Sequence, residues 1–468
     1  MKRLAVLNVV GLTEALMGEH TPAISAFRRT GNLSRIRPAF PAVTCTAQSN
    51  YLTGKTPAQH GIVGNGWYHR ELAEVQFWKQ SNHIVQASKI WDALSPGSTT
   101  ANCFWWYNMY SRVDYAITPR PMYPADGRKF FDIYSWPYGI RPEIKKDLGE
   151  FPFFGFWGPA AGIDSPPGRS DCVSRWIAAS AQWIENKFSP TLNLVYLPHL
   201  DYNLQRHGPY DGSGGLNPKI HRDLQELDAI VGGLIDFYDK RGVQVVLLSE
   251  YGITNVNTPV SLNRLFREQG WLAIKEELGL EILDAGASKV FAVADHQVAH
   301  IYLNDPALET AVRRLLEKTA GVEIILAGPE KAKAGIDHIR AGDLIAVAPS
   351  NAWFNYYYWR DDRRAPDFAR TVDIHRKPGY DPVELFLDPK LPSPKLKIAW
   401  RLLQKKLGFR MLMDVIPLDA TLVKGSHGRR PADKKEWPVF ISPEPAGSSQ
   451  SEMDSTDVYQ ALLGQFAV

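Results

Sequence analysis

Two hydrophobic periods alternate along the chain, and they predict buried strands separated by amphipathic helices. Nearly continuous apolar runs, typical of parallel strands covered on both faces, occupy residues 4–10, 192–197 and 243–248. Helical spacing marks residues 22–30, 87–94, 171–188, 218–238 and 307–317, and shorter strands are expected at residues 99–105, 291–295, 299–303 and 344–347. The pattern indicates an α/β fold with a mainly parallel central sheet flanked by helices, in which ligands gather at the carboxyl ends of the strands.

The stretch from residue 40 to residue 68 departs from this pattern, because it is polar and rich in turn residues. One short helix is expected there, over residues 45–52, and Thr44 opens it. A hydroxyl in this position can cap the free N–H groups of the first turn, which is its commoner role. It can also attack an electrophile that these N–H groups and the helix dipole help to hold.

Two segments interrupt the alternation and are expected to be insertions, at about residues 105–170 and about residues 350–415. The first is dense in aromatic residues and prolines, which suits either a packed surface insertion or an aromatic cap over a substrate pocket. The second contains residues 390–410, with seven basic residues and no acidic one.

Within that basic segment Leu396, Trp400, Leu403 and Leu407 recur at helical spacing. We expect an amphipathic helix that packs its leucine face on the body of the protein. Contact with a membrane surface is the alternative, which the short segment and the modest charge of the whole chain do not favour.

Composition narrows the class of protein. Of the 468 residues, 44% are apolar and 22% are charged, as in ordinary soluble globular proteins. The net charge of +3 is too small to indicate binding to a nucleic acid polymer. The three cysteines, Cys45, Cys103 and Cys172, cannot form a disulfide framework and suit a reducing compartment. Because a buried first strand explains the apolar start of the chain better than a signal peptide does, we expect a cytoplasmic protein.

A longer motif surrounds Thr44. It continues with Thr53-Gly54, Pro57 and the run His60-Gly61-Ile62-Val63-Gly64-Asn65. In these residues and spacings the chain resembles the nucleotide pyrophosphatase/phosphodiesterase branch of the alkaline phosphatase superfamily. The resemblance implies an alkaline phosphatase-like α/β domain over residues 1–430, followed by a partly mobile C-terminal extension over residues 431–468. It also implies that Thr44 attacks phosphorus and that Asn65 helps to hold a phosphoryl oxygen.

The resemblance further implies divalent metal ions, normally zinc, with manganese as the alternative. Asp201 and His427 match family ligands of a first ion. Gln205, Glu250-Tyr251 and Val10 stand where the family has His, Asp-His and Asp. We therefore expect one resting ion, held by Asp201 and His427 with help from Gln205. A second ion, at Glu250 and Thr44, would bind only when phosphate bridges it. Residues that could complete a rebuilt site are His199, Tyr251, Asp295, His296 and His300.

Two functions follow from these residues. The first is a metal-dependent hydrolase of a phosphate ester, phosphodiester or pyrophosphate that works through a phospho-threonine intermediate. The alternative is a catalytically weakened member of the superfamily that binds a phosphorylated ligand. Both take a small phosphorylated molecule, and the sequence does not identify it.

Overall fold

The computed structural model describes residues 2–125, 130–163, 171–444 and 451–467. Its largest sheet has nine strands, in the order β21 (Glu452–Asp454), β2 (Asn32–Arg37), β20 (Val439–Ser442), β9 (Val243–Leu248), β1 (Arg3–Val9), β8 (Leu192–Leu197), β5 (Thr100–Cys103), β6 (Tyr115–Pro119) and β7 (Ile133–Trp136). The strands from β9 to β6 run parallel, and antiparallel pairs occur on both sides, where β20 meets β9 and β7 meets β6. The predicted α/β fold with a mainly parallel central sheet is confirmed.

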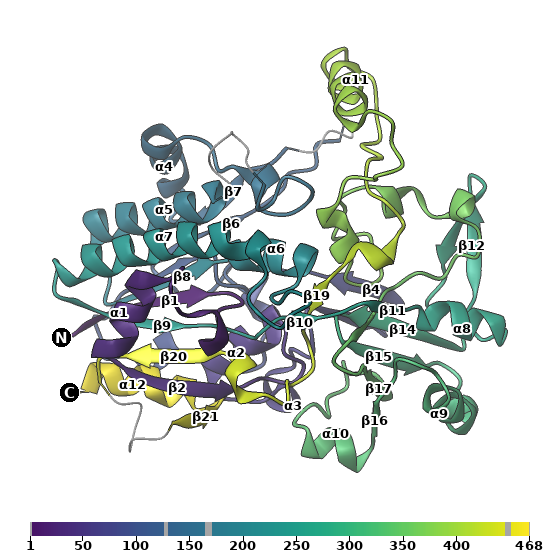
Figure 1. Cartoon of the computed structure of the whole chain (residues 1–468), viewed down its shortest axis with the longest axis horizontal. Helices are drawn as coiled ribbons and strands as arrows, with labels where there is room; N and C mark the ends of the chain where they lie inside the picture. Colours follow the sequence, from purple (N-terminus) through teal and green to yellow (C-terminus); the bar gives the residue numbers. More distant parts are fainter. Residues whose placement is uncertain (1, 126–129, 164–170, 445–450, 468) are drawn as a thin grey trace.

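Helices cover both faces of this sheet (Figure 1). One layer contains α1 (Pro22–Thr30), α5 (Cys172–Phe188) and α7 (His221–Asp239), and the other contains α2 (Thr44–Thr53) and α12 (Val458–Ala467). Strands β1 and β8 are buried along their apolar lengths because helices pack on each side of them. The register pairs Val9 with Leu197 and Asn8 with Leu248, so β1, β8 and β9 end side by side.

A second, smaller sheet is antiparallel. Its order is β14 (Val290–Asp295), β15 (Val298–Leu303), β17 (Leu344–Val347) and β16 (Ile324–Ala327). The strands expected at residues 291–303 and 344–347 are therefore present but lie outside the central sheet. A tight turn at His296, whose φ is +62°, joins β14 to β15 as a hairpin and brings Asp295 and His296 to one end of this sheet.

Shorter elements complete the fold. The remaining α-helices are α3 (Pro57–His60), α4 (Ile140–Leu148), α6 (His199–His207), α8 (Leu262–Glu268), α9 (Glu309–Glu317), α10 (Pro329–Lys333) and α11 (Pro394–Lys406). Two-stranded pairs join β3 (Gly66–His69) to β4 (Glu74–Phe77), β10 (Thr254–Asn255) to β19 (Gly425–Ser426), β11 (Thr258–Val260) to β18 (Ala352–Phe354), and β12 (Ile274–Glu277) to β13 (Leu280–Leu283). The helix expected at residues 87–94 is a 3-10 turn over Ile90–Ala93.

The C-terminal segment is part of the main domain and not a separate extension. β20 pairs with β9 and β2, β21 pairs with β2, and α12 packs on α2. These pairings hold the described parts of residues 431–467 to the sheet edge. Part of the C-terminal segment that was expected to be mobile, residues 445–450, lies outside the described residues.

Helix α11 projects from the body (Figure 1). None of its residues is buried, and Leu396, Trp400 and Leu407 are 70%, 58% and 64% exposed. The prediction that its leucine face packs on the body is therefore wrong. The physical reason is that the segment anchors through its other side and leaves this face uncovered. In the part of the chain that the structure describes, no helix is long and apolar enough to cross a membrane.

Candidate functional site

Thr44 is the first residue of α2, at the end of the central sheet where β1, β8 and β9 terminate. Val43 before it is extended, and Gly54 ends the helix in the left-handed conformation with φ +64°, which a glycine adopts without strain. Thr44 is 4% exposed and occupies the first helical position, after the N-cap residue Val43. Its hydroxyl therefore lies at a helix N-terminus, which favours anions.

Asn65 lies next to Thr44 and is held from two sides. Its Oδ1 accepts a hydrogen bond from the backbone N–H of Cys45 at 3.1 Å. Its Nδ2 donates to Asp295 Oδ1 at 3.1 Å, and its backbone N–H donates to Asp295 Oδ2 at 2.8 Å. The imidazole Nδ1 of His296 lies 2.8 Å from Asp295 Oδ1. Asp295, considered a metal ligand from the sequence, holds Asn65 in place beside Thr44.

A chain of hydrogen bonds links the hydroxyl of Thr44 to Asp201. Thr44 Oγ1 lies 3.2 Å from the Tyr251 hydroxyl, which donates to Asp201 Oδ1 at 3.2 Å. The Tyr251 ring stacks on His427 with centroids 3.6 Å apart and planes at 7°. His427 Nδ1 lies 2.7 Å from the carbonyl oxygen of Ala42. The structure thus brings Thr44, Tyr251, Asp201 and His427 together, from four separate parts of the chain.

Gln205 follows Asp201 by one turn of α6. Its Nε2 donates to Asp201 Oδ2 at 2.8 Å, and its Oε1 accepts from the Tyr380 hydroxyl at 3.0 Å. The carbonyl oxygen, which is the atom of glutamine that can bind a metal, thus faces the Tyr380 hydroxyl. The amide nitrogen of Gln205 orients the Asp201 carboxylate.

Glu250 forms a second polar cluster at the end of β9. Its Oε1 accepts from Gln48 Nε2 at 2.5 Å and from Asn8 Nδ2 at 2.6 Å. Gln48 lies one turn after Thr44, and its Oε1 accepts from the Trp106 backbone N–H at 2.7 Å. Sequence reasoning missed Gln48, although its spacing of four from Thr44 on a helix places both side chains on one face.

Burial governs the charge of these groups. Desolvation raises the pKa of Glu250 to about 8, that of Asp201 to about 7 and that of Asp295 to about 6, and hydrogen bonds offset part of each rise. Desolvation also lowers the pKa values of His296 and His427 well below the ordinary value. Both imidazoles are therefore neutral at neutral pH.

The donor set does not fit the two-ion centre that the family resemblance implies. Asp201 Oδ1 and His427 Nε2 face one another at 4.0 Å. Among the described residues, no three His, Cys, Asp or Glu side chains form a group that could hold a metal. At the second position Val10 is apolar, and the Tyr251 hydroxyl is bonded to Thr44 and Asp201. The resting ion predicted at Asp201, His427 and Gln205 therefore lacks a third ligand in this arrangement.

Two further candidate ligands lie elsewhere. His199 Nε2 is 3.0 Å from Asp223 Oδ1, on the neighbouring helix α7. Residues 199–207 are helical, and two positions along a helix are about 200° apart, so His199 and Asp201 lie on different faces of α6. His300 contacts the Val63 carbonyl oxygen through Nε2 at 3.0 Å and accepts the Gly342 N–H through Nδ1 at 3.1 Å. Both ring nitrogens of His300 are thus engaged in holding loops.

Aromatic side chains stand beside the site. Trp78 contacts Trp106 with ring centroids 4.9 Å apart, and Tyr380 lies 5.6 Å from Trp157 and 3.6 Å from the ring of His296. Because Trp106 also donates its backbone N–H to Gln48, this group adjoins the first turns of α2. Part of the aromatic insertion therefore contributes to the surroundings of Thr44.

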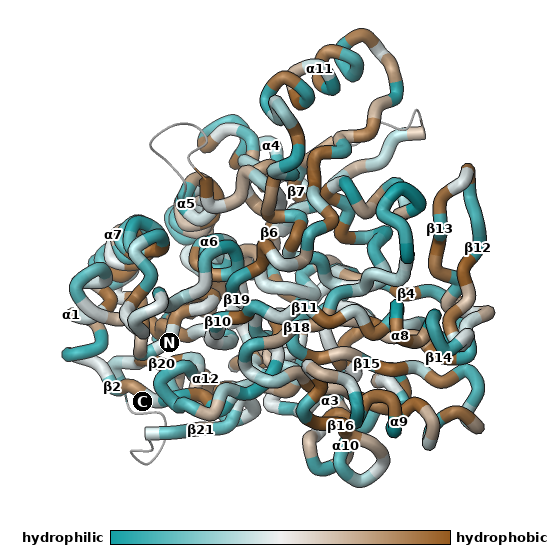
Figure 2. The backbone as a smooth tube through the Cα atoms, turned by 45° about the vertical axis from the view of Figure 1, so that its right-hand side comes forward, coloured by the Kyte–Doolittle hydropathy of each residue, from teal (hydrophilic) through white to brown (hydrophobic). Residues whose placement is uncertain are grey.

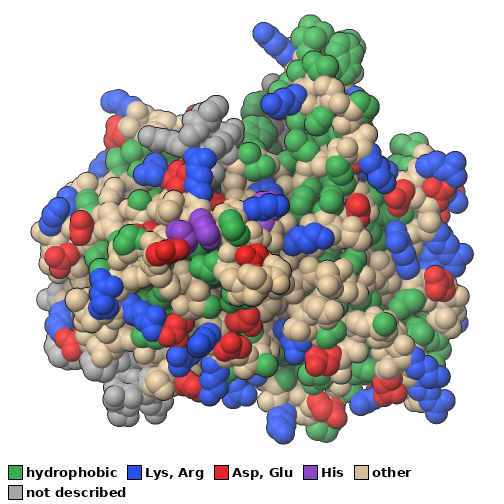
Figure 3. Space-filling view, in the orientation of Figure 1, with side chains coloured by type: hydrophobic (Ala, Val, Ile, Leu, Met, Phe, Trp, Pro, Cys, Tyr) green, Lys and Arg blue, Asp and Glu red, His purple; other side chains and the backbone are tan. Residues whose placement is uncertain are grey.

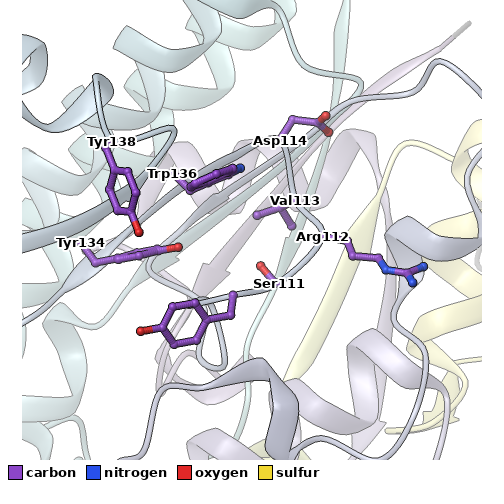
Figure 4. Close-up of a pocket in the computed structure, with 8 residues that line it drawn as sticks. Ser111, Arg112, Val113, Asp114, Tyr134, Trp136 and Tyr138 are labelled. Atoms are coloured by element: carbon purple, nitrogen blue, oxygen red, sulfur yellow. The ribbon is translucent and has the colours of Figure 1, made fainter.

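Another part of the insertion forms a separate cavity (Figure 4). The cavity has a volume of about 520 Å³ and is lined by Tyr110, Ser111, Arg112, Val113, Asp114, Tyr134, Trp136 and Tyr138. Asp114 bonds Thr100, the first residue of β5, through its backbone N–H at 3.0 Å. The cavity thus lies at the opposite end of the sheet from Thr44, and this part of the insertion is not a cap over the site.

The fold and the site together define an α/β protein of the alkaline phosphatase type, with a buried threonine at the carboxyl edge of its sheet. The chain belongs to the type I phosphodiesterase/nucleotide pyrophosphatase family, whose model matches residues 4–381. This confirms the resemblance found in the motif from Thr44 to Asn65. Members of the family generally use divalent metals, whereas this chain has Val10, Gln205 and Tyr251 at positions where the family resemblance implies metal ligands.

Individual relatives are distant. An uncharacterised pyrophosphatase/phosphodiesterase of Schizosaccharomyces pombe is 22% identical over 246 residues, which are 52% of this chain and 41% of that protein. The matched segment therefore spans well under half of the relative's length.

Solved structures share the fold. An inactive variant of murine ectonucleotide pyrophosphatase/phosphodiesterase 5 in complex with AMP matches with a TM-score of 0.58 and 13% identity, over 100% of this chain and 96% of that one. Phosphonoacetate hydrolase from Sinorhizobium meliloti 1021, in complex with phosphonoformate, matches with a TM-score of 0.56 and 14% identity, over 99% and 96%.

Proposed function

We propose that this protein hydrolyses a phosphoric ester of a small molecule through a covalent intermediate on Thr44. The observation that carries the proposal is the buried Thr44 hydroxyl, which starts α2 beside Asn65 and is bonded through Tyr251 to Asp201. Family membership supports this reaction class. So does the murine relative, which is inactive when one threonine is replaced by alanine and which binds AMP.

The proposed first step is attack by Thr44 Oγ on phosphorus. The bond from phosphorus to the leaving-group oxygen breaks, and the leaving group keeps the electron pair and takes up a proton from solvent water, which is made good when the attacking water of the second step releases its proton to solvent. The proton of Thr44 passes to Tyr251 as the Tyr251 proton passes to Asp201, so that the Asp201 carboxylate is the final acceptor. Water then attacks the phosphoryl group on Thr44, and Thr44 recovers its proton as phosphate or a phosphate monoester leaves.

Two features of the chain would stabilise the transferring group. The N-terminus of α2, which begins at Thr44, favours an anion in front of it through the helix dipole. The Asn65 amide is fixed by Cys45 and Asp295, so it is oriented before the substrate arrives. No step is assigned to a bound ion, because the described donors do not make a centre for one.

The aromatic side chains beside the site favour a leaving group with a planar or apolar part. Trp78, Trp106 and Tyr380 are rigid walls of this kind and are near the first turns of α2. A nucleotide and an isoprenoid-like ester both have such a part, so each is a substrate to compare.

The test is to trap the intermediate with an aryl phosphodiester substrate. Acid quenching of the wild-type protein followed by mass spectrometry is expected to find a phosphoryl group on the peptide that contains Thr44. Thr44→Ala is expected to lower turnover by about a thousandfold or more, and Thr44→Ser to retain part of it. Because Thr44 is the first helical residue and the N-cap position is occupied by Val43, stability should change by less than about 1 kcal/mol.

Cys45→Ala is the matched control. Cys45 is also in the first turn of α2, but it is fully buried, and desolvation raises the pKa of its thiol well above the ordinary value. Turnover that survives Thr44→Ala and is lost in Cys45→Ala would reject Thr44 as nucleophile. Phosphate binding without turnover in the wild type would instead favour the alternative of a binding protein.

A further inference from the structure

Helix α11 and its flanks form a projecting hairpin over residues 386–414, which we call the α11 hairpin. It stands clear of both sheets in Figure 1, and in Figure 2 hydrophobic and hydrophilic stretches alternate along it. Figure 3 shows hydrophobic side chains gathered at its tip, with basic side chains around them. We propose that this hairpin docks the protein on the surface of an anionic lipid bilayer.

An exposed apolar stripe runs along α11. Leu396, Trp400, Leu403 and Leu407 are spaced by four, three and four residues, which places them on one face of the helix. They are 70%, 58%, 45% and 64% exposed, and Phe409 beyond the helix end is 65% exposed. A continuous apolar face of this kind is uncommon on a surface that meets only water.

The opposite side of the helix anchors it. Ile398, Leu391 and Met413 pack against the core of the smaller sheet. Lys397 Nζ lies 2.8 Å from Asp414 Oδ2, and Arg401 Nη2 lies 2.9 Å from Asp414 Oδ1. These contacts fix the rotation of the helix about its own axis. The apolar stripe therefore faces outward from a helix that is held in place.

Charge identifies the partner. The segment 390–410 has seven basic residues and no acidic one, more than the whole chain's net charge of +3, so the rest of the chain is net negative. Lys397 and Arg401 are paired with Asp414, whereas within the described structure no carboxylate pairs with Lys390, Lys395, Lys405, Lys406 or Arg410. Basic residues that flank exposed Trp, Leu and Phe are the pattern of interfacial helices on anionic lipid. A second copy of the chain would bring like charges together.

The hairpin also lies near the site. It starts after Leu385, whose carbonyl oxygen accepts a hydrogen bond from Arg206 Nε at 2.9 Å. Arg206 is on α6, the helix that contains Asp201. Docking through the hairpin would therefore place the region of Thr44 and Asp201 close to the lipid surface.

The test is flotation of the full-length protein with two kinds of vesicle, phosphatidylcholine alone and phosphatidylcholine mixed with phosphatidylglycerol. We expect co-flotation with the mixed vesicles, little with the neutral ones, and release by salt. Trp400→Ser combined with Leu407→Ser is expected to lower the bound fraction by about tenfold. Lys405→Glu combined with Lys406→Glu should lower it similarly and remove most of the salt dependence.

Two control variants separate docking from general surface effects. Leu278→Ser changes an apolar side chain that is 102% exposed in the turn between β12 and β13, and Lys318→Glu reverses an exposed charge at the end of α9. Both should float like the wild type. Wild-type protein that stays unbound to anionic vesicles, or hairpin variants that float unchanged, would overturn the proposal. A third outcome would also overturn the proposal: a wild-type protein that dimerises but does not float, and that loses dimerisation in the hairpin variants. That result would assign the apolar face to contact with a second copy of the chain.

Discussion

At the scale of single residues, the site depends on side chains that hold other side chains. Asp295 shows this most clearly, because its two oxygens accept both N–H groups of Asn65 and one also contacts His296. Gln205 and Gln48 act in the same way on Asp201 and Glu250. Five of the residues in these contacts are candidate metal ligands in the sequence, namely Asp201, Gln205, Glu250, Asp295 and His296, because a polar side chain near a strand end suits both roles.

Asp295→Asn tests this positioning role. An amide in this position offers one acceptor oxygen where two N–H groups of Asn65 need two, so Asn65 should shift. We expect kcat to fall by about ten- to a hundredfold with KM little changed, as for weakened transition-state contacts. Asp337→Asn, at an exposed carboxylate, is the control. Equal losses in both variants, or loss of the folded state in Asp295→Asn, would indicate a structural role alone.

Lys89 gives a prediction on pH. Desolvation lowers its pKa to about 7, and among the described residues the acceptor of its Nζ is the Tyr107 carbonyl oxygen, at 3.4 Å. The unfolded chain keeps the ordinary, higher pKa, so between about pH 7 and about pH 10 it binds more protons than the folded protein, and stability rises with pH. Lys89→Met should therefore raise the free energy of unfolding by on the order of 4 kcal/mol near pH 7, since each pKa unit is worth about 1.4 kcal/mol.

Chemical denaturation of wild type and Lys89→Met across this pH range provides the measurement. The difference between the two proteins should shrink as the pH approaches 10. A difference that is constant with pH would mean that Lys89 is not desolvated as the fold implies.

At the scale of elements, close backbone packing sets the position of His427. Strand β19 pairs with β10 and lies against α6, and a Cβ added to Gly425 would be 2.1 Å from the Leu204 carbonyl oxygen. Only glycine allows this approach. The contact keeps the loop of His427 next to the helix of Asp201.

Gly425→Ala should separate these two elements. We expect a loss of about 1–3 kcal/mol in unfolding free energy, as for overpacked sites, together with a loss of turnover. Gly233→Ala is the matched control, because it is inside α7 with no atom within 4 Å of an added Cβ; it should stabilise the helix by about 0.5–1 kcal/mol. Thermal unfolding and turnover of both variants decide the point, and a fully active, equally stable Gly425→Ala would refute it.

At the scale of the whole molecule, the site is a junction between two sheets. Thr44, Asp201 and Glu250 come from the end of the central sheet, whereas Asp295 and His296 come from the hairpin of the smaller one. Each sheet has its own apolar core. The polar side chains where the two sheets meet lie in the region in which the family resemblance implies metal ions.

Metal content is the prediction at this scale. Because only Asp201 and His427 face one another, and zinc commonly needs about four ligands, the dialysed protein should retain well below one equivalent of zinc or manganese. Elemental analysis of the purified protein measures this. One or two tightly held equivalents would show that His296 or Glu250 moves to complete a site.

The sequence by itself determined the central strands, the start of α2 and the motif from Thr44 to Asn65. The period of the hydrophobic residues, the turn residues and the short motif spacings are local properties, so they can be recognised in the sequence without a structure. The tertiary structure alone decided three other matters: the role of Asp295, 230 positions from Asn65; the closure of the Glu250 cluster by Gln48; and the exposure of the α11 stripe. Each depends on which distant element packs against a side chain, and a leucine face has the same spacing whether a core or only solvent lies in front of it.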